Sequence, residues 1–157
     1  MPSSNSTKPK AKATTKAKPP VTRSTRKPPD RLEEREQARV VRWSHLTPAR
    51  ALMPSLRWLH HSPNGGKRDA FTGAQLKAMG VKPGFPDLIL PVRSGQIPGL
   101  VIEMKSQTGQ VTSEQADWLD HYAEQGWATA VARSAEEARM ILCEYVGCDP
   151  LKAPPLP

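Results

Sequence analysis

Two carboxylates and one amine in this chain have the types and spacing that chemistry on a phosphate ester needs. Asp87 directly precedes the apolar run 88–92, and Glu103 and Lys105 lie at the end of a second apolar run, 100–104. Charged groups beside aliphatic strands are costly unless they pair with one another or hold a metal ion. Mg²⁺ prefers oxygen ligands and usually takes one or two carboxylates, which leaves positions for water and phosphate. The pattern favours metal-assisted phosphodiester hydrolysis, with a cross-strand ion pair on a solvated face as the alternative.

A β-hairpin is the element that would bring these groups together. Segment 93–98, between the two apolar runs, consists mostly of turn-forming residues, so the runs are expected to pair as antiparallel strands. In a hairpin centred on Gly95, the numbers of paired residues sum to about 190, which places Asp87 opposite Glu103. Side chains alternate along a strand, so Glu103 and Lys105 share one face.

Short motifs surround these residues in a fixed order. They are Pro63-Asn64-Gly65-Gly66, the stretch 76–87 that ends in Gly84-Phe85-Pro86-Asp87, then Ile102-Glu103-Met104-Lys105, and Thr112-Ser113-Glu114-Gln115. Together they resemble the VRR-NUC family (virus-type replication-repair nucleases), a branch of the PD-(D/E)XK nuclease superfamily. The resemblance runs from about residue 32 to residue 146, and the chain looks most like the short stand-alone members found in phages and bacteria. It implies an α/β fold with a restriction-endonuclease-like core, in which helices flank a mixed β-sheet.

The resemblance also implies a role for each residue at the hairpin. Asp87 and Glu103 would bind Mg²⁺ or Mn²⁺, and the backbone carbonyl of Met104 would add a third ligand. Lys105 would orient the attacking water and help to deprotonate it.

Two further residues are implied by the same resemblance. Gln115 would position the catalytic lysine or the water, although a capping box at the start of its helix is the alternative role. Glu33 would complete the acidic cluster directly or through water, because in the family a helix-borne glutamate precedes a glutamine by four residues, as Glu33 precedes Gln37. Glu34 and Glu36 stay open as candidates for that position, and stabilisation of the helix dipole is the alternative explanation.

The charge of the chain is concentrated at its N-terminus. Residues 1–31 contain nine Lys or Arg and one Asp, a net charge of +8, whereas residues 32–157 contain fourteen basic and fourteen acidic side chains. The N-terminal segment also has six prolines and no aromatic residue, so it cannot bury enough apolar surface to fold. We expect a disordered basic tail that is attracted to DNA or RNA, with a solubilising extension as the alternative.

Phosphate contacts are expected from cations in two loops and in this tail, with a solvated turn as the alternative for the first loop. The candidates are Lys67 and Arg68 after a predicted turn at 64–66, Lys82 in the loop before Asp87, and the tail residues Lys8, Lys10, Lys12, Lys16 and Lys18.

The remaining pattern predicts alternating helices and strands around the hairpin. We expect helices over 31–46, 72–79, 112–125 and 134–146, and strands over 56–61 and 127–132. The expected division is a basic tail over 1–30, a nuclease domain over 31–147, and a loose Pro-rich C-terminal tail over 148–157.

Other site classes fit the sequence less well. His60-His61 with Asn64 resembles an HNH nuclease pattern, but no second histidine falls in the following helix. Gly65-Gly66-Lys67 lacks the earlier glycine of a phosphate-binding loop, so no nucleotide cofactor is expected. Tryptophans are expected in the core or at a dimer interface rather than as base-stacking platforms; they are Trp43, Trp58, Trp118 and Trp127.

DNA endonuclease is the function that these observations favour. Short stand-alone relatives are associated with homodimers that resolve four-way junctions, so the resemblance implies a Holliday-junction-resolvase-like homodimer that acts on branched DNA. The alternatives are a nuclease with relaxed structure or flap preference in phage replication or repair, and a non-catalytic basic DNA-binding protein. No secretion signal or membrane span is visible, so the expected location is the cytoplasm of a bacterial or phage-infected cell, with no membrane partner.

Overall fold

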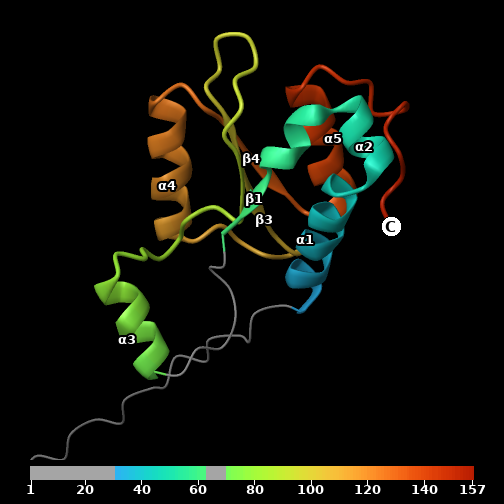
Figure 1. Cartoon of the computed structure of the whole chain (residues 1–157). Coiled ribbons are helices and arrows are strands. Elements are labelled where there is room, and N and C mark those ends of the chain that lie inside the picture. The colour runs from blue at the N-terminus through green and yellow to red at the C-terminus, as the bar shows by residue number, and fades with distance from the viewer. Residues whose placement is uncertain (1–30, 63–69) are drawn as a thin grey trace, which may run out of the picture.

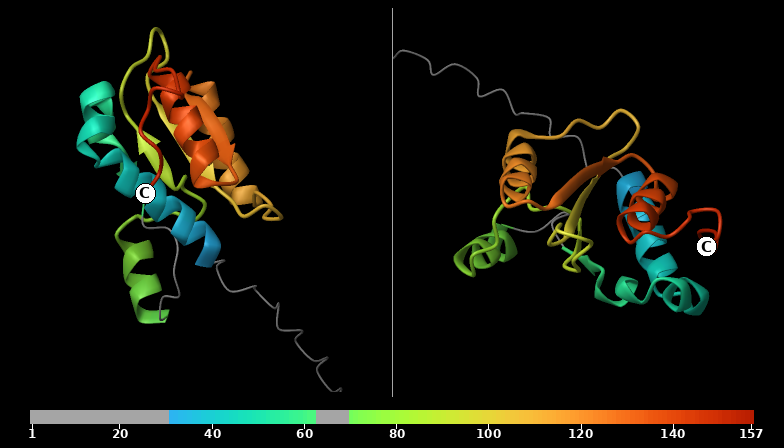
Figure 2. Two further views of the ribbon diagram at one scale, coloured as in Figure 1. Left: turned by 90° about the vertical axis from the view of Figure 1, so that its right-hand side faces the viewer. Right: turned by 90° about the horizontal axis from the view of Figure 1, so that it is seen from above.

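A mixed β-sheet lies between two layers of helices. The computed structural model describes residues 31–62 and 70–157. Its elements, in chain order, are α1 (Arg31–Ser44), α2 (Thr47–Leu52), the 3₁₀ helix η1 (Pro54–Trp58), β1 (His60–His61), α3 (Ala70–Ala78), β2 (Leu88–Leu90), β3 (Leu100–Met104), α4 (Ser113–Glu124), β4 (Ala128–Ala132) and α5 (Ala135–Tyr145). Helix α4 covers one face of the sheet, and α1 and α5 cover the other (Figure 1, Figure 2). The predicted mixed sheet with flanking helices is confirmed.

The four strands of the sheet follow one another in the order β1-β2-β3-β4. The first two pairings are antiparallel, and β3 pairs with β4 in parallel. The predicted hairpin register is confirmed, because Leu88 pairs with Ile102 and Leu90 pairs with Leu100, so the numbers sum to 190. Extended by one residue, this register sets Asp87 opposite Glu103.

The core lies between the sheet and the α1–α5 layer. Val40 and Trp43 of α1 are fully buried there, together with Ile102 and Met104 from alternate positions of β3. Because side chains alternate along a strand, Glu103 points to the opposite face, towards α4. Because its neighbours on β3 are buried in the core, Glu103 is buried on the α4 side of the sheet.

Two prolines explain where the fold departs from the sequence-based expectation. The segment predicted as a strand over 56–61 is instead η1 followed by the two-residue strand β1, and α2 was not predicted. Pro48 and Pro54 occupy the first turns of α2 and η1, where proline's fixed φ and missing N–H are tolerated. From the sequence, Pro48 was interpreted only as a residue that stops the first helix, predicted to end at residue 46. Helix α1 ends at Ser44.

Helix α3 projects away from the rest of the domain in all three views (Figure 1, Figure 2). It begins two residues before the predicted start at 72, and Gly80 follows its end with a φ of +91°. The predicted turn at 64–66, Lys67, Arg68 and the basic tail lie outside the described residues.

The C-terminal segment packs against the helices, so the expectation of a loose tail is wrong. The Trp43 indole N–H donates to the Pro154 carbonyl at 2.8 Å, and the Arg139 guanidinium donates to the Pro150 carbonyl at 3.0 Å. Ala153 is buried in the same contact. No helix within the described ranges is long and apolar enough to cross a membrane.

Candidate active site

A close approach between a loop and α4 delivers Asp87 to the sheet. Gly84 has a φ of +78°, and a Cβ atom there would lie 2.5 Å from the carbonyl carbon of Glu114. Only glycine fits such a contact, so the loop can pass directly over the first turn of α4. The Trp118 indole N–H donates to the Pro83 carbonyl at 3.0 Å and fixes the same loop from the next turn.

Asp87 is held by its backbone and by its side chain. Its carbonyl oxygen accepts hydrogen bonds from the Ser62 amide at 2.9 Å and from Gln37 Nε2 at 3.3 Å, and it lies 3.2 Å from His61 Nδ1. Its Oδ2 accepts from the Met104 amide at 2.9 Å. The carboxylate is therefore fixed beside the end of β3, where Glu103 lies.

Glu103 is the most deeply buried charged residue of the site, with 1% of its surface exposed. Its Oε1 accepts from Lys105 Nζ at 2.8 Å and from Gln115 Nε2. Its Oε2 is also buried, yet within the described part of the chain it has no hydrogen-bond partner. A buried carboxylate oxygen without a donor is costly, so this oxygen is suited to receive a cation.

Gln115 forms the predicted capping box, and its side chain also reaches the site. Its Oε1 accepts from the Thr112 amide at 3.0 Å, and the Thr112 side chain accepts from the Gln115 amide, which completes the capping box of α4. The other end of the same amide, Nε2, donates to Glu103. The helix cap therefore orients the group that reaches into the site.

Burial raises the pKa of both carboxylates at the site. The pKa of Glu103 is raised to about 7, mainly because the side chain is buried and secondly because of the negative charge of Asp87. Lys105 opposes this shift. Burial also raises the pKa of Asp87, against the hydrogen bond from the Met104 amide. A divalent cation between two such groups would remove the repulsion.

The residues present fit a hard divalent cation that needs few protein ligands. Nowhere in the ranges 31–62 and 70–157 do three or more His, Cys, Asp or Glu side chains form a group placed to hold a metal. Asp87 and Glu103 thus offer two carboxylates, which is the number that Mg²⁺ usually takes from a protein. The unpartnered Glu103 Oε2 is the structural feature that favours this reading.

Glu33 lies at the border of the site, and Glu33 and Glu36 of α1 each accept a hydrogen bond from a backbone amide. Glu33 Oε1 accepts from the Ser106 amide at 2.6 Å, directly after Lys105 in the chain. Glu36 Oε2 accepts from the Ala135 amide at 2.7 Å, and Glu34 is exposed. The structure thus places Glu33 next to the site but not in a cluster with Asp87 and Glu103.

The role of Arg133 beside the site was not predicted from the sequence. Its Nη1 donates to three carbonyl oxygens of the loop that follows Lys105, at distances of 2.9, 3.2 and 2.9 Å; they belong to Ser106, Gln107 and Gly109. Nothing in the sequence pattern signals this contact. The spacing of Gln37 from Glu33 was a sequence signal, whereas the HNH-like pattern and the predicted strand gave no indication that His61 approaches the Asp87 carbonyl.

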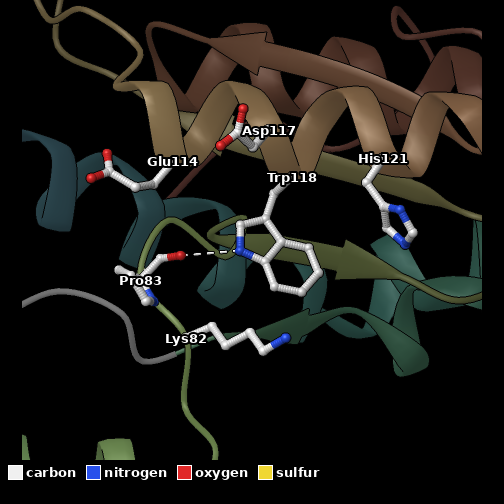
Figure 3. A pocket seen from close by; sticks show the side chains of 6 residues that line it. All are labelled: Lys82, Pro83, Glu114, Asp117, Trp118 and His121. Carbon is white, nitrogen blue, oxygen red and sulfur yellow. Dashed lines mark hydrogen bonds between the residues drawn. The ribbon is translucent and has the colours of Figure 1, made fainter.

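Lys82 lies in a shallow groove on the outer side of α4 rather than among the site residues. Figure 3 shows it beneath the Trp118 ring, with Glu114, Asp117 and His121 along the helix above. Lys82 is the one phosphate-contact candidate that lies within the described residues. The carboxylates of Glu114 and Asp117 repel a phosphate in this groove, which weakens the prediction for Lys82.

Comparisons with known proteins agree with the geometry. The model of the VRR-NUC domain matches residues 23–136, a range that includes every described candidate site residue. A solved structure described as a "VRR_NUC domain protein" is similar to this chain with a TM-score of 0.60 and 27% sequence identity, over 74% of this chain and 88% of that one. The search of curated proteins finds no match.

Proposed function

Because this chain belongs to the VRR-NUC family, a family of nucleases that act on DNA, we propose that it is a divalent-metal-dependent DNA endonuclease. The observation that carries the proposal is the buried Glu103 carboxylate, which has an unpartnered oxygen, lies opposite Asp87 and contacts Lys105. A cross-strand ion pair on a solvated face would need none of this burial. In a non-catalytic DNA-binding protein, nothing would offset the free-energy cost of burying that unpartnered oxygen.

The proposed metal ligands are the oxygen atoms at the end of β3. Asp87 and Glu103 would hold Mg²⁺ or Mn²⁺, with the Met104 carbonyl as a further ligand and Glu33 acting through water. A divalent ion bound there activates water and offsets the negative charge that develops on the phosphate.

Lys105 and Gln115 would organise the groups around that ion. Lys105 Nζ lies 2.8 Å from Glu103 Oε1, so its ammonium is available at the same place to orient the attacking water and to stabilise charge on the phosphate. Gln115, anchored on the Thr112 amide, keeps the Glu103 carboxylate in one orientation. Hydrogen bonds to the Asp87 carbonyl from Gln37 of α1 and from the Ser62 amide, directly after β1, hold the opposite carboxylate in place.

The proposal extends to the substrate and the assembly. A homodimer with two-fold symmetry would present two such sites to opposed strands, as cleavage of a four-way junction requires. The support for this step is analogy with short stand-alone relatives. A nuclease with relaxed or flap preference is the second candidate, and the basic tail would raise the affinity for either substrate.

Cleavage of labelled four-way junction, 5′ flap and plain duplex DNA tests the proposal. Wild-type protein, Asp87→Ala and the control variant Asp120→Asn, an exposed carboxylate of α4, are compared with Mg²⁺, with Mn²⁺ and with EDTA. We expect metal-dependent cutting by the wild type and the control and none by Asp87→Ala. Equal cutting of all three DNAs removes the junction preference only, whereas cutting by Asp87→Ala at the wild-type rate contradicts the assigned site.

A further inference from the structure

An exposed tryptophan lies outside the proposed active site. All four tryptophans fall within the described residues; Trp43 is buried and Trp118 and Trp127 are half-buried, but 59% of Trp58 is exposed. Of the two predicted locations, the core and a dimer interface, the exposure of Trp58 leaves the core out. A large ring left in water forgoes the free energy of burial, and tryptophan is enriched where proteins bind other molecules.

Two arginines accompany this ring in a surface groove between η1 and the chain after β2. The Arg57 guanidinium lies 5.0 Å from the centroid of the Trp58 ring, a cation–π distance that holds one face of the indole in place. Arg93 lines the same groove, and Pro54 and Pro91 form stiff walls. The described residues that line this groove include no Asp or Glu.

The charge of the lining distinguishes this groove from two others on the described surface. The groove on α4 has Glu114 and Asp117 in its lining, and a third groove along α1 has Glu34 and Glu36 beside its arginines. Apart from Ser55, the groove at Trp58 is lined by cations and apolar groups, so of the three it is the one complementary to an anion with a flat apolar part. A nucleotide has both features.

The chain after β2 gives the position of the groove relative to the active site. Trp58 is the last residue of η1, and it lines the groove together with Pro91, which directly follows β2. Pro91 and Asp87 flank β2 and are four residues apart, which is about 13 Å of extended chain. A DNA strand with a rise of about 3.4 Å per nucleotide covers this distance in about four nucleotides.

We propose that this groove binds an unpaired nucleotide of the DNA substrate, about four nucleotides from the bond that is cleaved. The base stacks on the open face of the Trp58 ring, and Arg57 and Arg93 contact the neighbouring phosphates. Bases inside a duplex are already stacked on one another, so the groove favours DNA with a single-stranded segment next to a duplex. The inference rests on the proposed function and adds a substrate feature to it.

Binding measurements without cleavage test the groove. A duplex and the same duplex with a short single-stranded tail are titrated, in EDTA, with wild type, Trp58→Ala, Arg93→Gln and the control variant Arg42→Gln, which removes an exposed cation from α1. We expect the wild type and Arg42→Gln to prefer the tailed DNA. Trp58→Ala loses affinity for the tailed DNA by about 5-fold to 100-fold, the range found on removal of one base-stacking side chain, and little for the duplex. Arg93→Gln binds the tailed DNA with a salt dependence reduced by about 0.7 in slope.

Two outcomes overturn the inference. One is an equal loss of affinity for both DNAs. The other is an unchanged preference for the tailed DNA in Trp58→Ala, and a change in the oligomeric mass of that variant would then assign the surface to contact with another protein chain. Wild-type cleavage with Mg²⁺ is measured on the same preparation. If the wild type cleaves DNA and Trp58→Ala binds as the wild type does, only the role of the groove is rejected. If the wild type binds neither DNA, the proposed function is rejected as well.

Discussion

Replacement of Glu103 by glutamine is expected to stabilise the metal-free protein at high pH. Burial and the charge of Asp87 raise the pKa of Glu103 from 4.5 to about 7 in the folded state. The folded state therefore holds a proton that the unfolded state has released, and stability falls as the pH rises from about 4.5 to about 7. At 1.36 kcal/mol per pKa unit, the ionised Glu103 costs the fold about 3 kcal/mol at pH 8. Glutamine resembles the protonated acid and carries no such cost.

The assay is urea unfolding of wild type and Glu103→Gln in EDTA at pH 4 and pH 8. We expect similar free energies of unfolding at pH 4 and a variant that is more stable by about 3 kcal/mol at pH 8. Glu124→Gln, which removes an exposed carboxylate of α4, should show no such pH-dependent difference. Mg²⁺ at 100 times its dissociation constant should stabilise the wild type by about 2.7 kcal/mol and leave Glu103→Gln unaffected. A variant that is no more stable than the wild type at pH 8 refutes the reasoning from burial.

Three further variants test how the site is positioned. Thr112→Ala should cost about 1 kcal/mol of stability through the lost helix cap and keep cleavage, whereas Gln115→Ala should lose the cap and also cleave much more slowly; thermal unfolding and single-turnover cleavage separate the two effects. Gly84→Ala should reduce cleavage strongly, because the added methyl displaces the loop that carries Asp87, and unimpaired cleavage would contradict this account. Deletion of residues 1–30 should weaken DNA binding and flatten its dependence on salt without abolishing cleavage at high enzyme concentration, as filter binding from low to high salt would show.

Local sequence signals were sufficient to predict the central hairpin. Two apolar runs of similar length around a turn-rich segment permit few registers, and a slip by one residue would move Glu103 from the α4 side of the sheet to the core. The glycine and prolines before Asp87 indicate a stiff loop, although the clash at Gly84 that makes glycine necessary appears only in three dimensions. The Gln115 signal was ambiguous because one side chain satisfies both motifs.

Contacts between distant segments were beyond the sequence pattern. Arg133 holds carbonyls 24 to 27 residues away, and His61 approaches the Asp87 carbonyl from a strand 26 residues earlier. No periodicity encodes such pairs, since each depends on the path of the whole chain. The C-terminal segment looked loose because its prolines preclude regular structure, yet proline carbonyls still accept hydrogen bonds from Trp43 and Arg139.

The rate of DNA cleavage as a function of Mn²⁺ concentration tests most directly whether the buried carboxylate pair binds a catalytic metal. Wild type and Glu103→Gln are compared at saturating DNA, with binding of the DNA verified for both. We expect wild-type cleavage to be absent in EDTA, to rise with Mn²⁺ and to saturate, and we expect Glu103→Gln not to cleave at any Mn²⁺ concentration. Cleavage by the wild type without a divalent ion, or by Glu103→Gln at the wild-type rate, would contradict this expectation.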